Sequence, residues 1–150
     1  MADDIADAIN RAMIETNVAE QRLHFRRFDE AVELLASSLQ RYGSLCALYP
    51  SSYAIDCAAR LAARTGQPRA AATLVGAANH MRDIIGAPVE GSHGTRRAQL
   101  IEENRHQLAN PAAYDEALAE GELMSFDDAI DAAIAAVASE VPPPRDELPF

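Results

Sequence analysis

The chain has 150 residues, of which 13 are basic and 23 acidic, so its formal net charge is −10. Alanine, the strongest helix former, accounts for 31 of the residues, whereas the β-branched and aromatic residues that favour strands are scarce. This composition argues against an all-β fold and against a doubly wound sheet, which needs several runs rich in Val and Ile. We therefore expect an all-α protein of about six or seven helices.

The basic residues exclude two kinds of enzyme. All 13 are arginine and none is lysine, so the chain has neither the lysine of a Walker A phosphate loop nor an amine nucleophile for Schiff-base chemistry. Residues 111–140 hold eight acids and no base. Because such a surface repels a phosphate backbone, we expect no direct contact with nucleic acid.

The location of the protein is predicted from what its sequence does not show. No apolar run approaches the roughly 18 residues of a membrane span, and the acidic N-terminus does not look like a signal peptide. The two cysteines, Cys46 and Cys57, stand in apolar surroundings and form no CxxC motif. We expect both to be reduced, in a cytoplasmic protein that does not contact membranes.

Apolar spacing predicts two helices in the first third of the chain. The first runs from Asp3 to about Gln21. The second starts near Asp29, a candidate N-cap residue, and stops at Gly43, a residue suited to the left-handed end of a helix. The apolar stripe of the first helix is expected to be its buried face and consists of Ile5, Ala8, Ile9, Ala12, Met13 and Thr16.

Turn residues delimit the next two helices. Ser51 and Ser52 are expected to cap the third. Pro68 is placed to open the fourth, where its missing N–H costs nothing, and Gly86 to close it. Gly76 would destabilise the interior of that helix unless it allows close packing against a neighbour. Residues 87–94 are expected to form a loop.

Three further helices complete a single domain over residues 1–140. One is expected near residues 95–108, and a short one opens at Asn110-Pro111 and closes at Gly121. The last helix starts after Ser125, which together with Asp128 resembles a capping box. Residues 141–150 are rich in proline and are expected to be a flexible tail.

Two segments repeat at a period of 40 residues. When residues 26–37 are aligned with residues 66–77, Ala31 matches Ala71 and Leu35 matches Val75. The alanines occupy the position where a tetratricopeptide hairpin needs a small residue. The repeat predicts stacked antiparallel helical hairpins in a tetratricopeptide-like, right-handed superhelix.

A longer pattern of alanine, glycine and proline is carried by Ala62, Gly66, Pro68, Ala71, Ala72, Leu74, Gly76, Ala77, Ala78, Arg82, Gly86 and Pro88. A second part of the pattern follows at Gly121, Met124, Ser125, Asp128 and Ala129. Together they resemble the C-terminal helical region of LuxR-type and cyclase-linked bacterial regulators that are built around a signalling ATPase, and the second part is similar to the family's ending. The similarity extends over about residues 20–138.

The resemblance implies a regulatory role. In that family the region is a tetratricopeptide-like array thought to receive a protein or small-molecule signal. This sequence carries no ATPase, no DNA-binding helix pair and no cyclase, so any regulatory output would come from elsewhere. The resemblance therefore favours a non-enzymatic interaction domain in transcriptional regulation.

Residues suited to catalysis or metal binding are few. The histidines (His24, His80, His93 and His106) include no pair at the i, i+4 spacing of a helical zinc clamp. Neighbouring acids such as Glu102 and Glu103 point about 100° apart on a helix, and no serine stands in a GxSxG elbow. We expect no catalytic residue, no metal and no cofactor.

The predicted contact surface combines aromatic and arginine side chains, which dominate interface energetics. We expect it to bind a protein or peptide partner, and a homodimer is left open. The alternative is a small-ligand sensor with an apolar pocket between helices. The surface consists of Tyr53, Arg60, Arg64, Arg82 and Arg96, with Tyr42 and Tyr49 at its edge.

Overall fold

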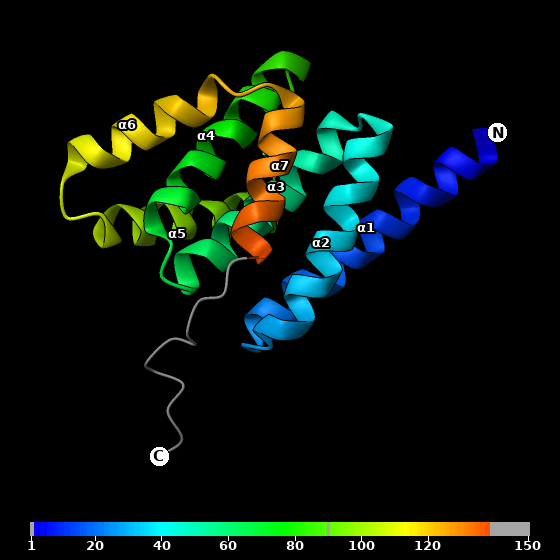
Figure 1. Ribbon diagram of the computed structural model, residues 1–150, viewed down its shortest axis with the longest axis horizontal. Coiled ribbons are helices and arrows are strands. Elements are labelled where there is room, and N and C mark those ends of the chain that lie inside the picture. Colours follow the sequence, from blue (N-terminus) through cyan, green and yellow to red (C-terminus); the bar gives the residue numbers. More distant parts are fainter. Residues whose placement is uncertain (1, 90, 139–150) are drawn as a thin grey trace.

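The computed structural model describes residues 2–89 and 91–138, and over these ranges it consists of α-helices without any strand (Figure 1). The predicted all-α class and helix number are confirmed. The predicted tail, residues 141–150, lies outside the described residues. The helices are α1 (Ala2–His24), α2 (Phe28–Leu45), α3 (Leu48–Arg64), α4 (Pro68–Ile85), α5 (Gly91–Gln107), α6 (Pro111–Glu122) and α7 (Phe126–Ala138).

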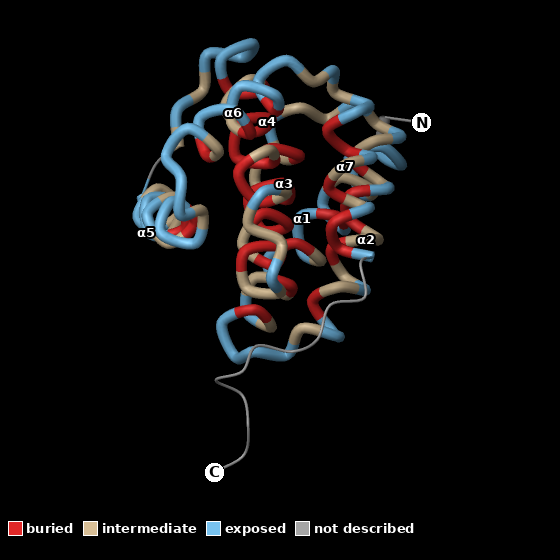
Figure 2. The backbone as a smooth tube through the Cα atoms, turned by 60° about the vertical axis from the view of Figure 1, so that its left-hand side comes forward, coloured by how far each residue is buried: buried red, intermediate tan, exposed pale blue. Residues whose placement is uncertain are grey.

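The helices form hairpins around α3. Short turns at residues 25–27 and 65–67 join α1 to α2 and α3 to α4, and each pair packs together. The chain then places α5 against α3 and α4, and α6 along α4, whereas α7 returns to lie on α2 and α3. Figure 2 shows α5 at the edge of the molecule, with most of its surface exposed. The predicted hairpins are therefore present, and α7 packs against both of them, on α2 of the first and α3 of the second. The superhelical hand stays a prediction.

Small side chains form much of the core. Every residue from 54 to 59 on α3 is buried, which fits a helix that has neighbours on several sides. Ala31 and Ala71, the alanines matched by the repeat, are fully buried near the start of α2 and α4. Because a methyl group occupies so little space, these faces let neighbouring helices approach closely.

The close contact between α4 and α6 involves two glycines. A Cβ atom added to Gly76 of α4 would collide with the carbonyl oxygen of Leu118, and one added to Gly121 of α6 would collide with that of Thr73. The close packing predicted for Gly76 is thus confirmed. Gly121 was expected to end its helix, but α6 continues to Glu122. The glycine is needed for backbone contact rather than for termination.

Several predicted helix ends are confirmed. Pro68 is the first residue of α4, and Gly86 closes that helix with a φ of +65°. At the start of α6, the side-chain oxygen of Asn110 accepts a 3.0 Å hydrogen bond from the N–H of Ala112. The Ser125 hydroxyl accepts a 3.1 Å bond from the N–H of Asp128 before α7. Each of these helix ends is determined by residues only a few positions apart in the sequence.

Two predicted ends of α2 are wrong. Its N-cap is Arg27 rather than Asp29, and the helix passes Gly43 to reach Leu45. Cys46 takes the left-handed conformation in place of the glycine, with a φ of +50°. Gly43 is instead held inside α2, where an added Cβ would lie 3.1 Å from the Ile130 side chain on α7. Packing between helices overrides the local stop signal.

The predicted start of α3 is also wrong, and so is the second half of the predicted loop 87–94, whereas residues 87–89 do lie outside the helices. The third helix begins at Leu48, so Ser51 and Ser52 lie inside it, and their hydroxyls donate to the carbonyls of Ala47 and Tyr49 instead of capping. Proline is tolerated in a first turn, which lets the helix include Pro50. The fifth helix begins at Gly91, four residues before the predicted start.

The buried face of α1 differs from the predicted stripe. Ala12, Thr16, Ala19 and Leu23 are buried, whereas Met13 is 45% exposed. Figure 1 shows the N-terminal part of α1 projecting beyond α2, so the apolar residues of that part have no helix to cover them.

Among the described helices, none has both the length and the apolar character that crossing a bilayer requires.

Candidate functional site

A buried carboxylate lies where α3, α4 and α5 meet. Asp56 of α3 is 1% exposed. Its Oδ2 accepts a 2.6 Å hydrogen bond from Nη2 of Arg82 on α4, and its Oδ1 accepts a 3.2 Å bond from Nε of Arg97 on α5. Nε2 of His93, in the first turn of α5, lies 3.2 Å from Oδ2. The carboxylate thus anchors two neighbouring helices to α3.

The partners of Asp56 keep it ionised. Burial by itself would raise the pKa of this carboxyl group, but the hydrogen bond with His93 and the charges of Arg97 and Arg82 outweigh it. The pKa of Asp56 therefore lies below its ordinary value. A buried ion pair of this kind fixes geometry more surely than it adds stability, because desolvation offsets much of the attraction.

A second carboxylate connects α1 to the same cluster. Oε1 of Glu20 lies 3.3 Å from Nη1 of Arg60 on α3 and 3.1 Å from Nη1 of Arg96 on α5. His93 lies between the two acids, with its Nδ1 3.8 Å from Glu20. The position of α5 against α1 and α3 thus depends on charged contacts.

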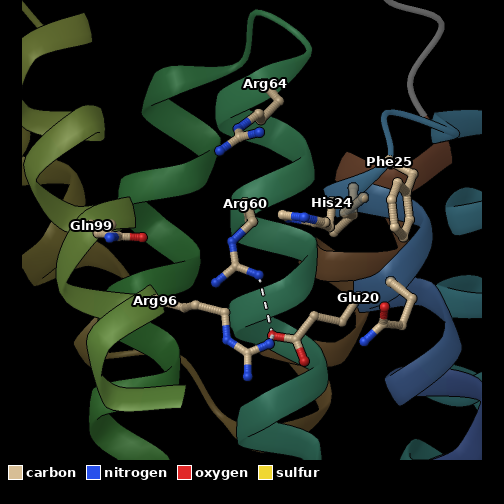
Figure 3. A pocket seen from close by; sticks show the side chains of 9 residues that line it. Glu20, His24, Phe25, Arg60, Arg64, Arg96 and Gln99 are labelled. Carbon is tan, nitrogen blue, oxygen red and sulfur yellow. Dashed lines mark hydrogen bonds and ion pairs between the residues drawn. The ribbon is translucent and has the colours of Figure 1, made fainter. Parts of the chain in front are cut away.

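Three arginines, Arg60, Arg64 and Arg96, line a hollow of about 510 Å³ between α1, α3 and α5, which we call the arginine hollow. Figure 3 shows the side chains of Arg60, Arg64 and Arg96 along it, with Glu20 at one end. His24 and Gln99 line it from α1 and α5. The hollow is rich in positive charge although the whole chain is strongly acidic.

A second hollow adjoins the first and is mostly apolar. It measures about 480 Å³, and Glu20, Arg96 and His93 stand where it meets the cluster of charged residues. We call it the apolar hollow. Glu20 and Arg96 belong to both hollows. Its apolar lining consists of Ile9, Met13, Tyr42, Ala47, Tyr49, Pro50, Tyr53 and Cys57.

Aromatic side chains that pack edge to face form one wall of the apolar hollow. Tyr49 and Tyr53, one turn apart on α3, meet edge to face with their hydroxyl oxygens 2.9 Å apart. This hydrogen bond and partial burial raise the pKa of Tyr53 to about 12. The ring of His93 packs on Tyr53 at 4.4 Å, and the guanidinium of Arg82 lies 5.1 Å from the Tyr53 centroid.

The structure brings most of the predicted contact residues together. Tyr42, Tyr49, Tyr53 and Arg96 line the apolar hollow, and Arg60, Arg64 and Arg96 line the arginine hollow. Two residues differ from the expected surface position. Tyr42 is 1% exposed, since α1 covers it, and Arg82 is 6% exposed because it is paired with Asp56. Arg82 contacts this surface only through Tyr53, against whose ring its guanidinium packs.

Neither Asp56 nor Glu20 is predicted as a site residue from the sequence, and His93 is expected in a loop rather than in α5. One signal for Asp56 was available: it is the only acid in the largely apolar run from Tyr53 to Ala59. Such a residue has to find partners when its helix is buried. Glu20 looks in the sequence like an ordinary surface acid, and its role depends on the arrival of α5.

The remaining candidate residues are two histidines that line neither hollow and two free cysteines. His80 is half-buried and His106 is exposed. Cys57 is buried, which raises the pKa of its thiol to about 12, and Cys46 is exposed; both are free thiols. Among the residues that the structure describes, no group of three or more His, Cys, Asp or Glu is placed to hold a metal ion.

Comparison with known proteins adds no relative. Family models, curated proteins and solved structures were searched, and none matches this chain.

Proposed function

We propose that the chain is a non-enzymatic protein-interaction module whose binding groove is formed by the apolar hollow and the arginine hollow together. The observation that carries this proposal is the meeting of residues from α1, α3 and α5 around two adjoining hollows that share Glu20 and Arg96. Six of the seven residues predicted for partner contact line them. The occupant we propose is an amphipathic segment of another protein.

The lining of the groove is typical of an interface. Tyrosine, methionine and arginine are enriched in protein contacts because they offer large contact areas with polar ends. Tyr49 is 47% exposed and Met13 is 45% exposed, so both have apolar surface that a partner could cover. The apolar residues of α1 that extend beyond α2 would continue this contact.

Charge favours a partner with acidic residues beside its apolar ones. The groove gathers Arg60, Arg64 and Arg96 in a protein whose net charge is −10. An acidic partner is therefore repelled by most of the surface and attracted here, which favours one docking position. With the resemblance described above, this supports a recognition role in a cytoplasmic bacterial regulator, with no cofactor and no direct contact with nucleic acid.

Selection of displayed random peptides against the whole chain tests the proposal. We expect enriched peptides to carry apolar residues next to an acid, and to bind Met13→Glu about tenfold more weakly or worse, because a charge would enter the apolar hollow. Leu123→Glu is the matched control, since Leu123 is 87% exposed at the end of α6. Peptides that bind both variants equally well would place the contact elsewhere.

A second copy of the chain is the other protein that could fill the groove. Sedimentation velocity distinguishes this case: a dimer that dissociates in Met13→Glu but persists in Leu123→Glu would identify the partner as the chain itself. A monomer that binds selected peptides supports the proposed heterologous partner.

The volume of the apolar hollow supports a second candidate function, small-ligand sensing. At about 480 Å³ it is within the size range of ligand pockets. A ligand that binds only the folded state raises the melting temperature by mass action. A metabolite screen that raises it in the wild type and not in Met13→Glu, together with failure to select peptides, would favour the sensor.

A further inference from the structure

The arginine hollow has more cationic groups than its own acids neutralise. Arg60 and Arg96 both use the same oxygen of Glu20. Among the described residues, the acid paired with Arg64 is Glu103, whose carboxylate lies 3.7 Å from its Nε, beyond hydrogen-bond distance. That Nε is buried and has no hydrogen-bond acceptor among the described residues. The Arg64 side chain as a whole is 35% exposed, so an anionic ligand can reach the outer part of its guanidinium and supply an acceptor there.

We propose that the arginine hollow binds a carboxylate group of the partner segment, beside Arg64. The inference rests on the proposed interaction function and names the chemistry that the groove recognises. Arg60, Arg64 and Arg96 against Glu20 and Glu103 leave one positive charge. One carboxylate neutralises it, whereas a phosphate dianion would exceed it and be repelled by Glu20.

The hollow already shows that this chemistry fits. The carboxylate of Glu20 is held there between Arg60 and Arg96, and Figure 3 shows Arg64 farther along the same row, on the side of Arg60 away from Glu20. Arginine suits a carboxylate because its planar fork can donate two parallel hydrogen bonds. Arg64 has only a long ion pair with Glu103 among the described residues, so it can bind a carboxylate at its end of the row, and Glu20 keeps the other two arginines in place.

The rest of the lining of the arginine hollow defines the ligand further. Tyr53 lies 11 residues before Arg64 on α3, roughly 16 Å along the helix, but Phe25 lines the arginine hollow itself and is 65% exposed. The recognised element is therefore a carboxylate carried next to an apolar group. In a peptide this is an acidic residue near a large apolar one.

The test uses 4-phenylbutanoate and its uncharged amide as probes of the intact chain, followed by NMR of the arginine Nε–Hε signals. We expect the acid to shift the Arg64 signal and to bind at least about tenfold more tightly than the amide, as expected for charge-assisted hydrogen bonds. Equal binding of acid and amide would overturn the proposal. Inorganic phosphate binding more tightly than acetate would also overturn it.

Variants locate the effect. Arg64→Gln should weaken binding of the acid about tenfold, whereas Arg69→Gln, which alters an exposed arginine paired with Glu120, should leave it unchanged. Equal affinity in wild type and Arg64→Gln contradicts the site. Melting temperatures of all variants verify folding, and Arg64→Lys, which keeps the charge but not the fork, should recover part of the affinity.

The selected peptides distinguish this inference from the function on which it rests. Peptides that lose affinity in Met13→Glu, but tolerate both Arg64→Gln and replacement of their own acids by amides, would overturn the carboxylate site and leave the interaction function standing. If 4-phenylbutanoate binding depends on Arg64 while no peptide is selected, the carboxylate chemistry is supported, its source is a free organic acid, and the interaction function fails.

Discussion

The Asp56 carboxylate on α3 accepts a 2.6 Å hydrogen bond from Arg82 on α4, and both side chains are buried. Asp56→Asn would leave the guanidinium of Arg82 buried without its counter-charge. We expect the substitution to lower the free energy of unfolding by about 3–5 kcal/mol, the cost of breaking a buried pair. Urea denaturation measures this, and Asp83→Asn, an exposed change on α4, should cost less than about 0.5 kcal/mol.

The depressed pKa of Asp56 predicts a loss of stability in acid. A carboxyl group whose pKa is lower in the folded state than its ordinary 3.8 contributes its full stabilisation above that value, and loses it as pH falls through the folded pKa. We therefore expect unfolding free energies to fall below about pH 4. Contacts between α5 and α3 should weaken with them.

Amide exchange along α5 and urea denaturation from pH 2 to pH 6 measure this response. In Asp56→Asn the part of the pH dependence due to this group should vanish. A variant that keeps the full wild-type pH profile would assign the acid response to other carboxylates.

The contact between α4 and α6 predicts opposite effects for two identical substitutions. Gly121→Ala would force a methyl group into the carbonyl of Thr73, and we expect it to lower the unfolding free energy by about 1–3 kcal/mol or more, the usual cost of overpacking. Gly94→Ala lies in α5, where the nearest atom to an added Cβ is 3.6 Å away. It should raise the unfolding free energy by about 0.4–1 kcal/mol.

Thermal or urea unfolding of both glycine variants makes the comparison. If Gly121→Ala were as stable as the wild type, the helices would have room to separate and the tight crossing would not be a constraint. If Gly94→Ala were destabilised, the start of α5 would not be helical.

The parts of the fold that could be predicted from sequence are those set by local chemistry. Pro68 can occupy a first helical turn without losing a hydrogen bond, and Asn110 can reach an N–H two residues away, whatever the rest of the chain does. The alignment of Ala31 with Ala71 also predicted their environment correctly, since each is fully buried in the second helix of a hairpin.

The features that could not be predicted depend on which helices meet. The sequence pattern of α1 allows two apolar faces. Thr16 is buried and Met13 is exposed because α2 covers one of these faces and not the other. Gly43 and Gly121 resemble stop signals until α7 and α6 are packed against them. The two hollows form because α5 bridges α1 and α3, and its mean hydropathy gives no indication of that position.

The two cysteines should differ sharply in reactivity. Cys57 is buried beside the apolar hollow, and burial raises the pKa of its thiol to about 12, whereas Cys46 is exposed at the end of α2. Because the thiolate is the reactive form, we expect a disulfide reagent at pH 8 to label Cys46 quickly in the native protein and Cys57 only after unfolding. Cys46→Ser should remove the fast phase. A fast phase that persisted in this variant would show that α1 and α3 open readily over the apolar hollow, and a ligand that slowed the labelling of Cys57 would report occupation of that hollow.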